Sequence, residues 1–423
     1  MDIQPDKLPR TDSPVASSSM FKYRAFALFW AARLFSTLAV QAESVTIGWQ
    51  VYTVARHSRT VEQGAFLVGM VGLVQFVPLF LLTFIAGATA DRRAIMLACT
   101  AVEIVCVLVL AALSLHPSPS LIPIFAIAAV FGASRAFLSP ASAAIAPMLV
   151  PPHAIRDAIS RNSLADQAGF VIGPWIGGVL CAASPAVAYC GSAVLYAVAA
   201  SALLLMRANT RPERQPGSRM EQIREGIAYV WTNKIVFGAI SLDLFAVLLG
   251  GATALLPVFA SDILKVGAHG FGVLRSGPAI GAAAMAFALS RWRVHRRAGH
   301  WMFAGVAAFG VATIVFAVSK SMIVSVIALA ALGAADMISV YVRQSLVQIV
   351  TPDHLRGRVS AVAYLFIGAS GELGEFETGV VARVLGPVGA AIFGGVGSLV
   401  VTGAWALMFP SLRKADRLDG SQV

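Results

Sequence analysis

The 423-residue chain has few charged residues. Asp, Glu, Lys and Arg together make up 13% of the residues, whereas 58% are hydrophobic, and the mean hydropathy is +0.78. A soluble two-domain enzyme and a disordered chain are both excluded, because each needs a polar surface or a low hydrophobicity that this sequence lacks. The composition therefore indicates an integral membrane protein.

Cysteine is also scarce, and the four thiols, Cys99, Cys106, Cys181 and Cys190, lie in or beside apolar runs. A thiol in such a run behaves as a small hydrophobic group. The spacing predicts no disulfide framework, although Cys181 and Cys190 flank one short turn and could pair in an oxidising compartment.

Signals for catalysis are equally sparse. No phosphate-binding G-x-x-x-x-G-K-[ST] loop occurs, and the seven histidines fall mainly in loops without metal-ligand spacing. We therefore expect no enzyme activity, no catalytic residues, no cofactor and no metal. The net charge of +11 does not predict nucleic-acid binding, because the basic residues form no continuous face and belong in loops at the lipid bilayer.

Apolar runs long enough to cross a bilayer, which takes about 20 residues, divide the chain into six plus six predicted spans. They lie near 25–53, 64–90, 95–114, 121–148, 162–182 and 185–206, and then near 235–260, 270–290, 301–319, 322–349, 359–385 and 387–409. We expect an all-α integral membrane protein with twelve transmembrane helices in two pseudo-symmetric six-helix bundles. The bundles would cover residues 21–206 and 235–410.

The remaining segments are polar. Residues 1–20 predict a disordered cytoplasmic tail without a cleavable signal peptide, and residues 411–423 predict a cytoplasmic C-terminal tail. The linker 207–234 carries a capping box, Ser218 with Glu221, ahead of apolar residues at helical spacing. These residues are Met220, Ile223, Ile227 and Val230. We expect a surface helix that lies along the membrane.

The distribution of Lys and Arg predicts the orientation. Of the 32 such residues, 23 fall in the tails and loops of one side, 5 on the other side and 4 within spans. Because cytoplasmic loops hold the excess of basic residues, both termini and the linker are predicted to be cytoplasmic, in a multi-pass protein of the inner (plasma) membrane.

The two halves also repeat one another at an offset of 200 residues, after the fourth span of each half. The matching residues are Val150, Pro152, Ile155 and Arg156, and Val350, Pro352, Leu355 and Arg356. Four matches alone could arise by chance, but the six-plus-six spacing independently predicts such a duplication.

Between the second and third spans, Gly87 to Arg93 resembles the signature loop of the major facilitator superfamily. A glycine at a helix end permits close packing, and the acid and arginines can pin neighbouring helix ends. The resemblance implies a conformational latch made of Gly87, Asp91, Arg92 and Arg93. The second basic cluster of the usual loop is missing here, so we expect a weaker latch.

Other stretches resemble the branch of this superfamily that contains the bacterial enterobactin (siderophore) exporter. They are 45–52, 71–78, 242–253, 351–359 and 371–377. The resemblance implies a proton-coupled secondary exporter of a small amphipathic metabolite, siderophore or drug, working by alternating access and acting as a monomer. The alternatives are an uncoupled facilitator or lipid flippase, and a non-transporting membrane sensor that holds a partner through the linker.

Ionisable residues within spans usually face a wet interior, because a charge at mid-bilayer costs about 2.5 to 3.5 kcal/mol on insertion scales. The resemblance implies that spans one, four, seven and ten line the cavity. The substrate-cavity candidates are Arg33, Glu43, Arg135, Arg343 and Glu377, and the proton-coupling candidates are Asp243, Asp336, Glu372 and Glu375. Arg33 and Arg343 could instead snorkel from helix ends. We interpret Glu103, Asp166 and Arg275 as packing or gating residues.

Glu372 and Glu375 share one helical face, whereas Glu377 points away. Two carboxylates on one face at low dielectric cannot both ionise cheaply, so we expect one of them to stay protonated. Alternatively, the neighbouring glycines make a close helix contact and the acids hydrogen-bond to the next helix. Asp336 and Arg343 are about 10.5 Å apart along their helix, so a ligand or an eleventh-span acid would have to lie between them.

The fifth span carries a Gly-Pro-x-x-Gly-Gly motif that resembles the one common in exporter branches. It consists of Gly173, Pro174, Gly177 and Gly178. The resemblance implies a helix that bends and packs closely. Ordinary glycine packing between membrane helices is the alternative.

Overall fold

The computed structural model describes residues 22–83, 91–116, 120–151, 154–208, 210, 219–292, 296–352 and 355–414, and all regular structure within them is helical. The predicted N-terminal tail, Gly87 of the predicted latch, Ser218 of the capping box and residues 415–423 lie outside these ranges. The all-α fold class is confirmed. It follows from composition, since only helices satisfy the backbone polar groups of so apolar a chain within one segment.

Six long helices form the N-terminal half. They are α1 (Arg24–Arg56), α2 (Val61–Thr83), α3 (Arg92–Ser114), α4 (Leu121–Ile145), α5 (Ile155–Ala183) and α6 (Pro185–Leu205). Polar side chains begin several of them: Ser120 accepts from the backbone N–H of Ile122, and Ser184 accepts from that of Val187. Such caps satisfy backbone donors that a helix start leaves unpaired.

The C-terminal half follows the same plan. It contains α8 (Lys234–Leu249), α9 (Leu256–Val258), α10 (Gly267–Arg291), α11 (Ala298–Val318), α12 (Met322–Val350), α13 (Arg356–Met408) and α14 (Pro410–Arg413). Between α8 and α10 the chain also forms a 3₁₀ turn, η4 (Ala252–Leu255), and a π-helical turn, η5 (Phe259–Ile263). The turn η4 lines the central cavity described below.

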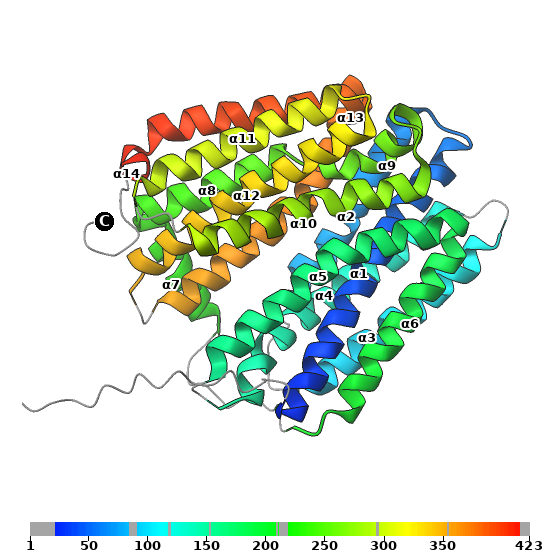
Figure 1. The fold of residues 1–423 in the computed structure, drawn as a ribbon, viewed down its shortest axis with the longest axis horizontal. Coiled ribbons are helices and arrows are strands. Elements are labelled where there is room, and N and C mark those ends of the chain that lie inside the picture. The colour runs from blue at the N-terminus through cyan, green and yellow to red at the C-terminus, as the bar shows by residue number, and fades with distance from the viewer. Residues whose placement is uncertain are drawn as a thin grey trace, which may run out of the picture.

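Eleven described segments are long and apolar enough to cross a membrane, one fewer than the twelve predicted. The difference lies in α13, where the predicted spans 359–385 and 387–409 are joined into one helix. The helix is broken at Gly386, whose φ of 73° and ψ of 167° are not helical, and Pro387 follows it. The apolar part, Phe366–Met408, has 43 residues, which is about 65 Å or twice the hydrocarbon thickness. Figure 1 shows its orange and red arms running back past one another.

The predicted linker helix is present as α7 (Arg219–Thr232). Val230 is buried and packs with Val359 and Val362 at the start of α13. The hydroxyl of Tyr229 donates to the carbonyl oxygen of Val350 at 2.8 Å. This helix is therefore packed against the C-terminal half.

The two halves lie close together where α1 ends and spread apart toward the end where α7 lies (Figure 1). Glycines allow the close approach. A Cβ added to Gly178 of α5 would lie 2.6 Å from the Cα of Gly272 of α10, and one added to Gly69 of α2 would lie 2.8 Å from the Cα of Gly379 of α13. Small residues at such crossings are how membrane helices gain packing energy.

Candidate functional site

A cavity of about 230 Å³ lies between the two halves, and we refer to it as the central cavity. Side chains from α1, α2, α4, α5, α10 and α13 line it. Its charged lining residues are Glu43, Arg135, Arg275, Glu372 and Glu375, and aromatic residues such as Phe131, Phe170 and Phe271 complete its wall. The cavity can thus contact both a charged group and an apolar body.

An ion pair joins the two halves across this cavity. Nη1 of Arg135, on α4, lies 2.7 Å from Oε1 of Glu372, on α13. The same nitrogen donates to Oε1 of Gln75 at 3.2 Å. Close packing brings α13 to this position, because a Cβ on Gly72 of α2 would lie only 2.7 Å from the carbonyl oxygen of Glu372. The guanidinium and the carboxylate therefore hold the halves together.

A second arginine faces Glu375. Nη2 of Arg275, on α10, lies 3.5 Å from Oε1 of Glu375, and its Nη1 donates to the carbonyl oxygen of Thr253 in η4 at 3.2 Å. Each of the two neighbouring acids thus has its own arginine on another helix. The sequence predicted either a pair in which one acid stays protonated or acids that hydrogen-bond to the next helix, and it named no arginine as the partner of either acid. Arg275 is a lining residue that sequence reasoning placed in a packing or gating role. Its charge within an apolar span was the available signal.

The other two proton-coupling candidates meet in the C-terminal half. Oδ2 of Asp243, on α8, lies 2.6 Å from Nη1 of Arg343, on α12, and both side chains are buried. Asp243 also lines a small cavity that it shares with Asp336 and Ser339. The sequence predicted a ligand or an eleventh-span acid beside Arg343. The structure instead places Asp243 of the seventh span there.

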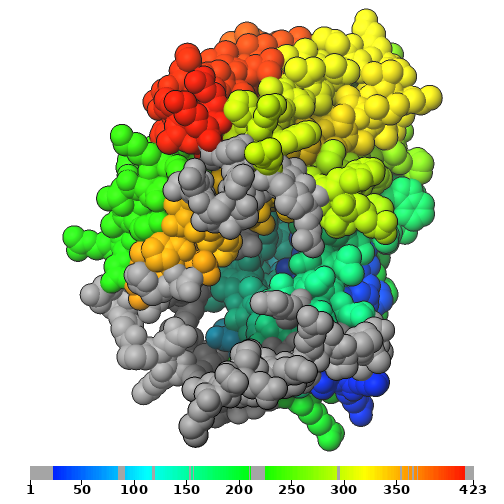
Figure 2. All heavy atoms as spheres, turned by 60° about the vertical axis from the view of Figure 1, so that its left-hand side comes forward, coloured from blue at the N-terminus to red at the C-terminus, as the bar shows by residue number. Residues whose placement is uncertain are grey.

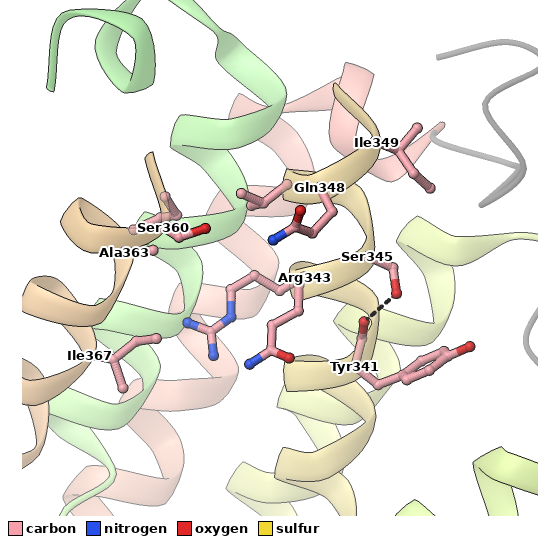
Figure 3. A pocket seen from close by; sticks show the side chains of 11 residues that line it. Tyr341, Arg343, Ser345, Gln348, Ile349, Ser360, Ala363 and Ile367 are labelled. Carbon is pink, nitrogen blue, oxygen red and sulfur yellow. Dashed lines mark hydrogen bonds between the residues drawn. The ribbon is translucent and has the colours of Figure 1, made fainter. Parts of the chain in front are cut away.

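Arg343 also lines a cavity of about 510 Å³, the α12 cavity, formed by α8, α12 and α13. Figure 3 shows the side chains of Arg343, Ser360 and Ile367 around it. Its polar lining comes from Tyr341, Arg343, Gln344, Ser345, Gln348 and Ser360, and its apolar lining comes from Ile240, Val347, Ile349, Ala363 and Ile367. None of these eleven residues is acidic. Nε of Arg343 is buried without a hydrogen-bond partner among the described residues.

The remaining cavity candidates lie elsewhere. Nε of Arg33 lies 2.6 Å from Oδ1 of Asp166, and its Nη1 donates to Ser142 Oγ at 2.6 Å, so it pairs with α5 and α4 instead of snorkelling. Neither Arg33 nor Glu377 is among the described lining residues of these cavities. Glu377 contacts the hydroxyl of Thr378 at 3.5 Å. Glu43 and Arg135 are therefore the predicted substrate-cavity residues that line the central cavity.

The described part of the predicted latch ties helix ends of the N-terminal half together. Asp91 caps α3 by accepting from the backbone N–H of Arg93 at 3.0 Å, and it also accepts from the hydroxyl of Thr210. The Thr210 hydrogen bond is the main reason that the pKa of Asp91 lies below its ordinary value. Arg93 donates from Nε to the carbonyl oxygen of Leu203 at 2.7 Å, and Arg92 donates from Nη1 to that of Ala144 at 3.1 Å.

The glycine motif of the fifth span lies in an uninterrupted α5, with Pro174 inside the helix. A Cβ on Gly173 would lie 2.6 Å from Gln41 Cβ, and one on Gly177 would lie 2.6 Å from the carbonyl oxygen of Ala42. Gly178 contacts α10, as described above. One side of the motif thus packs against α1, and its other side packs against α10 of the C-terminal half.

A further polar contact between the halves lies where α1 ends, and sequence reasoning missed it. Asp262, in the π-helical turn η5, accepts from the hydroxyl of Tyr52, and its Oδ1 lies 3.3 Å from Nη2 of Arg56. A π-turn inserts one residue into the helical register and re-aims the side chains around it. No sequence pattern marked Asp262 as a partner of α1.

Metal binding finds no support in the described ranges, where no group of three or more His, Cys, Asp and Glu residues could hold an ion. All four cysteines are free thiols, of which Cys99, Cys106 and Cys181 are buried and Cys190 is exposed.

Solved structures of transporters share the helical fold of this chain. One is a POT family transporter in complex with 5-aminolevulinic acid, with a TM-score of 0.72 and 12% identity over 92% of this chain and 96% of that one. Another is the nucleoside transporter NupG, with a TM-score of 0.68 and 14% identity over 91% and 99% of the two chains.

Residues 15–422 match the family described as transmembrane secretion effector, and the chain belongs to this family. Curated relatives include the multidrug efflux pump Tap of Mycolicibacterium fortuitum, 27% identical over 90% of this chain and 96% of the relative. Tap of Mycobacterium tuberculosis (strain ATCC 25618 / H37Rv) is 24% identical over 84% and 88%. The enterobactin exporter EntS of Shigella boydii serotype 4 is 23% identical over 92% and 93%.

Proposed function

We propose that this protein exports small amphipathic molecules, drugs or siderophores, in exchange for protons by alternating access. The observation that carries the proposal is the Arg135–Glu372 ion pair, which joins the two halves in the wall of the central cavity. Relatives named as a multidrug efflux pump and an enterobactin exporter support export and the kind of substrate. The chemistry resides in a protonatable carboxylate and its arginine, and no cofactor is needed.

The ion pair can couple protonation to movement. The side chain of Glu372 is 14% exposed and that of Arg135 is 41% exposed, so water and protons reach the pair through the cavity. Protonating Glu372 removes its charge and most of its attraction to Arg135. The halves then lose one of the contacts that hold them together, and a ligand group can replace Glu372 beside Arg135. Alternating access requires contacts of this kind, which form in one state and break in the other.

The proposed orientation gives the direction of transport. With both termini cytoplasmic, the end where α7 lies faces the cytoplasm and the end where α1 finishes faces outward. The halves spread apart at the cytoplasmic end (Figure 1), and a space-filling view from that side shows the surface hollowed between the orange start of α13 and the teal α5 (Figure 2). Substrate then enters from the cytoplasm, and the α12 cavity offers a further amphipathic surface near this entrance.

The proposed organisation follows from this orientation. A tail of residues 1–20, bundles of residues 21–206 and 235–410, the linker 207–234 and a tail of residues 411–423 would make a monomer in the inner membrane. Labelling of single cysteines in intact cells tests the sides. If a reagent added outside labels the linker, the proposed orientation is wrong and the proposed direction of transport is wrong with it.

The test of function has two stages. The medium of cells with and without the gene is first compared for compounds that only the expressing cells release. A compound found in this way is then loaded into proteoliposomes with purified protein, and its efflux is measured with and without an imposed pH gradient. We expect a gradient that is acidic outside to accelerate efflux severalfold in the wild-type protein but not in Glu372→Gln. Efflux at the same rate with and without the pH gradient would show an uncoupled facilitator. If the expressing cells release no additional compound, the non-transporting sensor is favoured.

A further inference from the structure

Two carboxylates are buried in the N-terminal half without a cation beside them. Glu43, on α1, is 4% exposed and Glu103, on α3, is 1% exposed. Neither forms an ion pair with any residue that the structure describes. Oε2 of Glu43 accepts a hydrogen bond from the hydroxyl of Tyr196 at 2.9 Å, whereas Oε2 of Glu103 is buried with no hydrogen-bond partner among described groups.

The titratable groups around this pair lie on α3 itself and on two further helices, α4 and α6. Tyr196 of α6 and the thiol of Cys106 on α3 face Glu43, and Cys99 lies one turn before Glu103. The charge of Arg135 on α4 acts on both acids, although its guanidinium is paired with Glu372. Arg135 is therefore the cation available to Glu43 and Glu103, and in this conformation Glu372 of the other half engages it.

Buried hydrogen bonds between α1 and α6 surround Glu43. The hydroxyl of Tyr189 donates to Gln50 Oε1 at 2.7 Å, and Gln50 Nε2 donates to Ser114 Oγ at 2.9 Å. Gln50 lies seven residues after Glu43 on α1, and Tyr189 lies seven residues before Tyr196 on α6. The two helices thus join through two buried polar rungs, two turns apart on each helix, and one rung fixes Glu43.

An ionised carboxylate buried without a cation costs several kcal/mol, and such a group binds a proton instead. We propose that Glu43 and Glu103 form a proton-binding site that holds a proton while Arg135 is paired with Glu372, and that supplies the counter-ion of Arg135 when this pair opens. This inference rests on the proposed alternating access. It assigns a second proton site, in the half opposite to Glu372 and Glu375.

The exchange balances in charge and in protons. Before it, Arg135 is a cation, Glu372 is an anion, and Glu43 and Glu103 are both neutral with one proton each. After it, Arg135 is still a cation, one of these two acids has given up its proton and is an anion, and Glu372 has taken up a proton. Arg135 thus has one anionic partner in each state, and a proton occupies the acid that Arg135 has left.

Infrared spectroscopy of the full-length protein in lipid tests the proposal directly, because a protonated carboxyl group absorbs at a C=O frequency separate from that of a carboxylate. At neutral pH we expect a protonated-carboxyl band that weakens in Glu103→Gln and weakens further in the double variant Glu43→Gln, Glu103→Gln. Glu62→Gln, which changes an acid in the first turn of α2, is the matched control for spectral changes caused by any Glu→Gln substitution. Gln keeps the size and hydrogen-bonding atoms of the side chain, and a monodisperse elution profile checks folding.

The decisive variant is Glu372→Gln, which leaves both acids of the site in place but removes the partner of Arg135. We expect the band assigned to Glu43 and Glu103 to weaken, because Arg135 then turns to them and the site ionises. A band unchanged in the double variant would place the proton elsewhere. A band unchanged in Glu372→Gln would show that the site is not the alternative counter-ion of Arg135. The infrared bands are measured without any transport. If they confirm the site but efflux does not respond to the pH gradient, the proposed coupling is refuted and the proton-binding site is still supported.

Discussion

At the scale of single residues, the central cavity depends on Arg135. Its Nη1 contacts Gln75 of its own half and Glu372 of the other half. The guanidinium plane fixes the directions of the two N–H bonds of Nη1, so this one nitrogen can serve two acceptors, whereas a lysine is a compact point charge on a flexible stem. The geometry of the cavity therefore depends on the planar shape of the arginine as well as on its charge.

Replacing Arg135 separates these two contributions. We expect Arg135→Gln to abolish gradient-driven efflux, because Glu372 loses its charged partner and stays protonated in both states. Arg135→Lys keeps the charge and loses the second contact, so we expect efflux that is reduced about tenfold and still coupled. Both are measured as efflux from proteoliposomes with and without a pH gradient. Equal rates for Arg135→Lys and wild-type protein would show that the planar guanidinium is not needed.

Asp91 predicts a pH dependence of stability. The hydrogen bond from Thr210 lowers its pKa in the folded protein, so the charged form contributes stability that is complete above the ordinary carboxyl pKa of about 3.9. The contribution is lost as the pH falls through the lower folded value. We expect Asp91→Asn, which also weakens a helix cap, to lower stability by about 0.5 to 2 kcal/mol at neutral pH.

Thermal unfolding of wild-type protein and Asp91→Asn across a pH series measures this difference. It should shrink in acid, and Thr210→Val should reproduce part of the loss at neutral pH. If Asp91 is also part of a latch, Asp91→Asn should transport more slowly but select the same substrates. If the Asp91→Asn protein is less stable but transports at the wild-type rate, Asp91 is a helix cap and not a latch.

At the scale of elements, glycine positions determine how the long helices cross. The motif on α5 looks like a bending device in sequence, yet α5 is continuous through Pro174, and its glycines provide close approach to α1 and α10. Gly386 differs, because its φ of 73° lies in a region that side chains rarely adopt, and it breaks α13 into two arms. The glycines of α5 therefore allow helices to pack closely, whereas Gly386 allows the chain to reverse its direction.

The packing role of Gly178 can be tested with alanine. A Cβ there would lie 2.6 Å from the Cα of Gly272 and 2.8 Å from the carbonyl oxygen of Ala268, so the two halves would have to move apart. We expect Gly178→Ala to lower the unfolding temperature and slow efflux. Gly403→Ala is the matched control, because nothing lies within 4 Å of its added Cβ, and helix propensity favours it by about 1 kcal/mol. A Gly178→Ala protein as stable as Gly403→Ala would contradict a tight crossing.

At the scale of the whole molecule, composition and the lengths of apolar runs were enough to predict an all-helical membrane protein with two halves, since the bilayer constrains both. The pairing of charges was not predictable. Asp243 and Arg343 lie 100 residues apart on helices whose relative rotation and depth depend on packing, so nothing in the spacing marks them as partners. For the same reason Asp262 was missed and Arg275 was assigned to packing or gating and not to the cavity wall, because irregular turns near both residues change the direction of the chain.

The contact of Asp262 with Tyr52 and Arg56 leads to a prediction for the molecule as a whole. It joins the halves at the end where α1 finishes, so it should favour the state closed at that end. Arg56 and Asp262 are about a third exposed, and such pairs contribute about 0.2 to 1 kcal/mol. We therefore expect Asp262→Asn to shift the two states by up to about fivefold toward the outward-open one.

Labelling of a cysteine in the central cavity measures the shift. Ser44 lines this cavity, and Cys190 is the exposed native thiol, so Ser44→Cys in a Cys190→Ser background reports access for an impermeant maleimide added outside. Asp262→Asn should raise the labelling rate, and Arg56→Asp should raise it further through repulsion of like charges. The double variant Arg56→Asp, Asp262→Arg restores opposite charges and should bring the rate back toward the wild-type value. A double variant that labels as fast as Arg56→Asp alone would show that this ion pair does not hold the outer end closed.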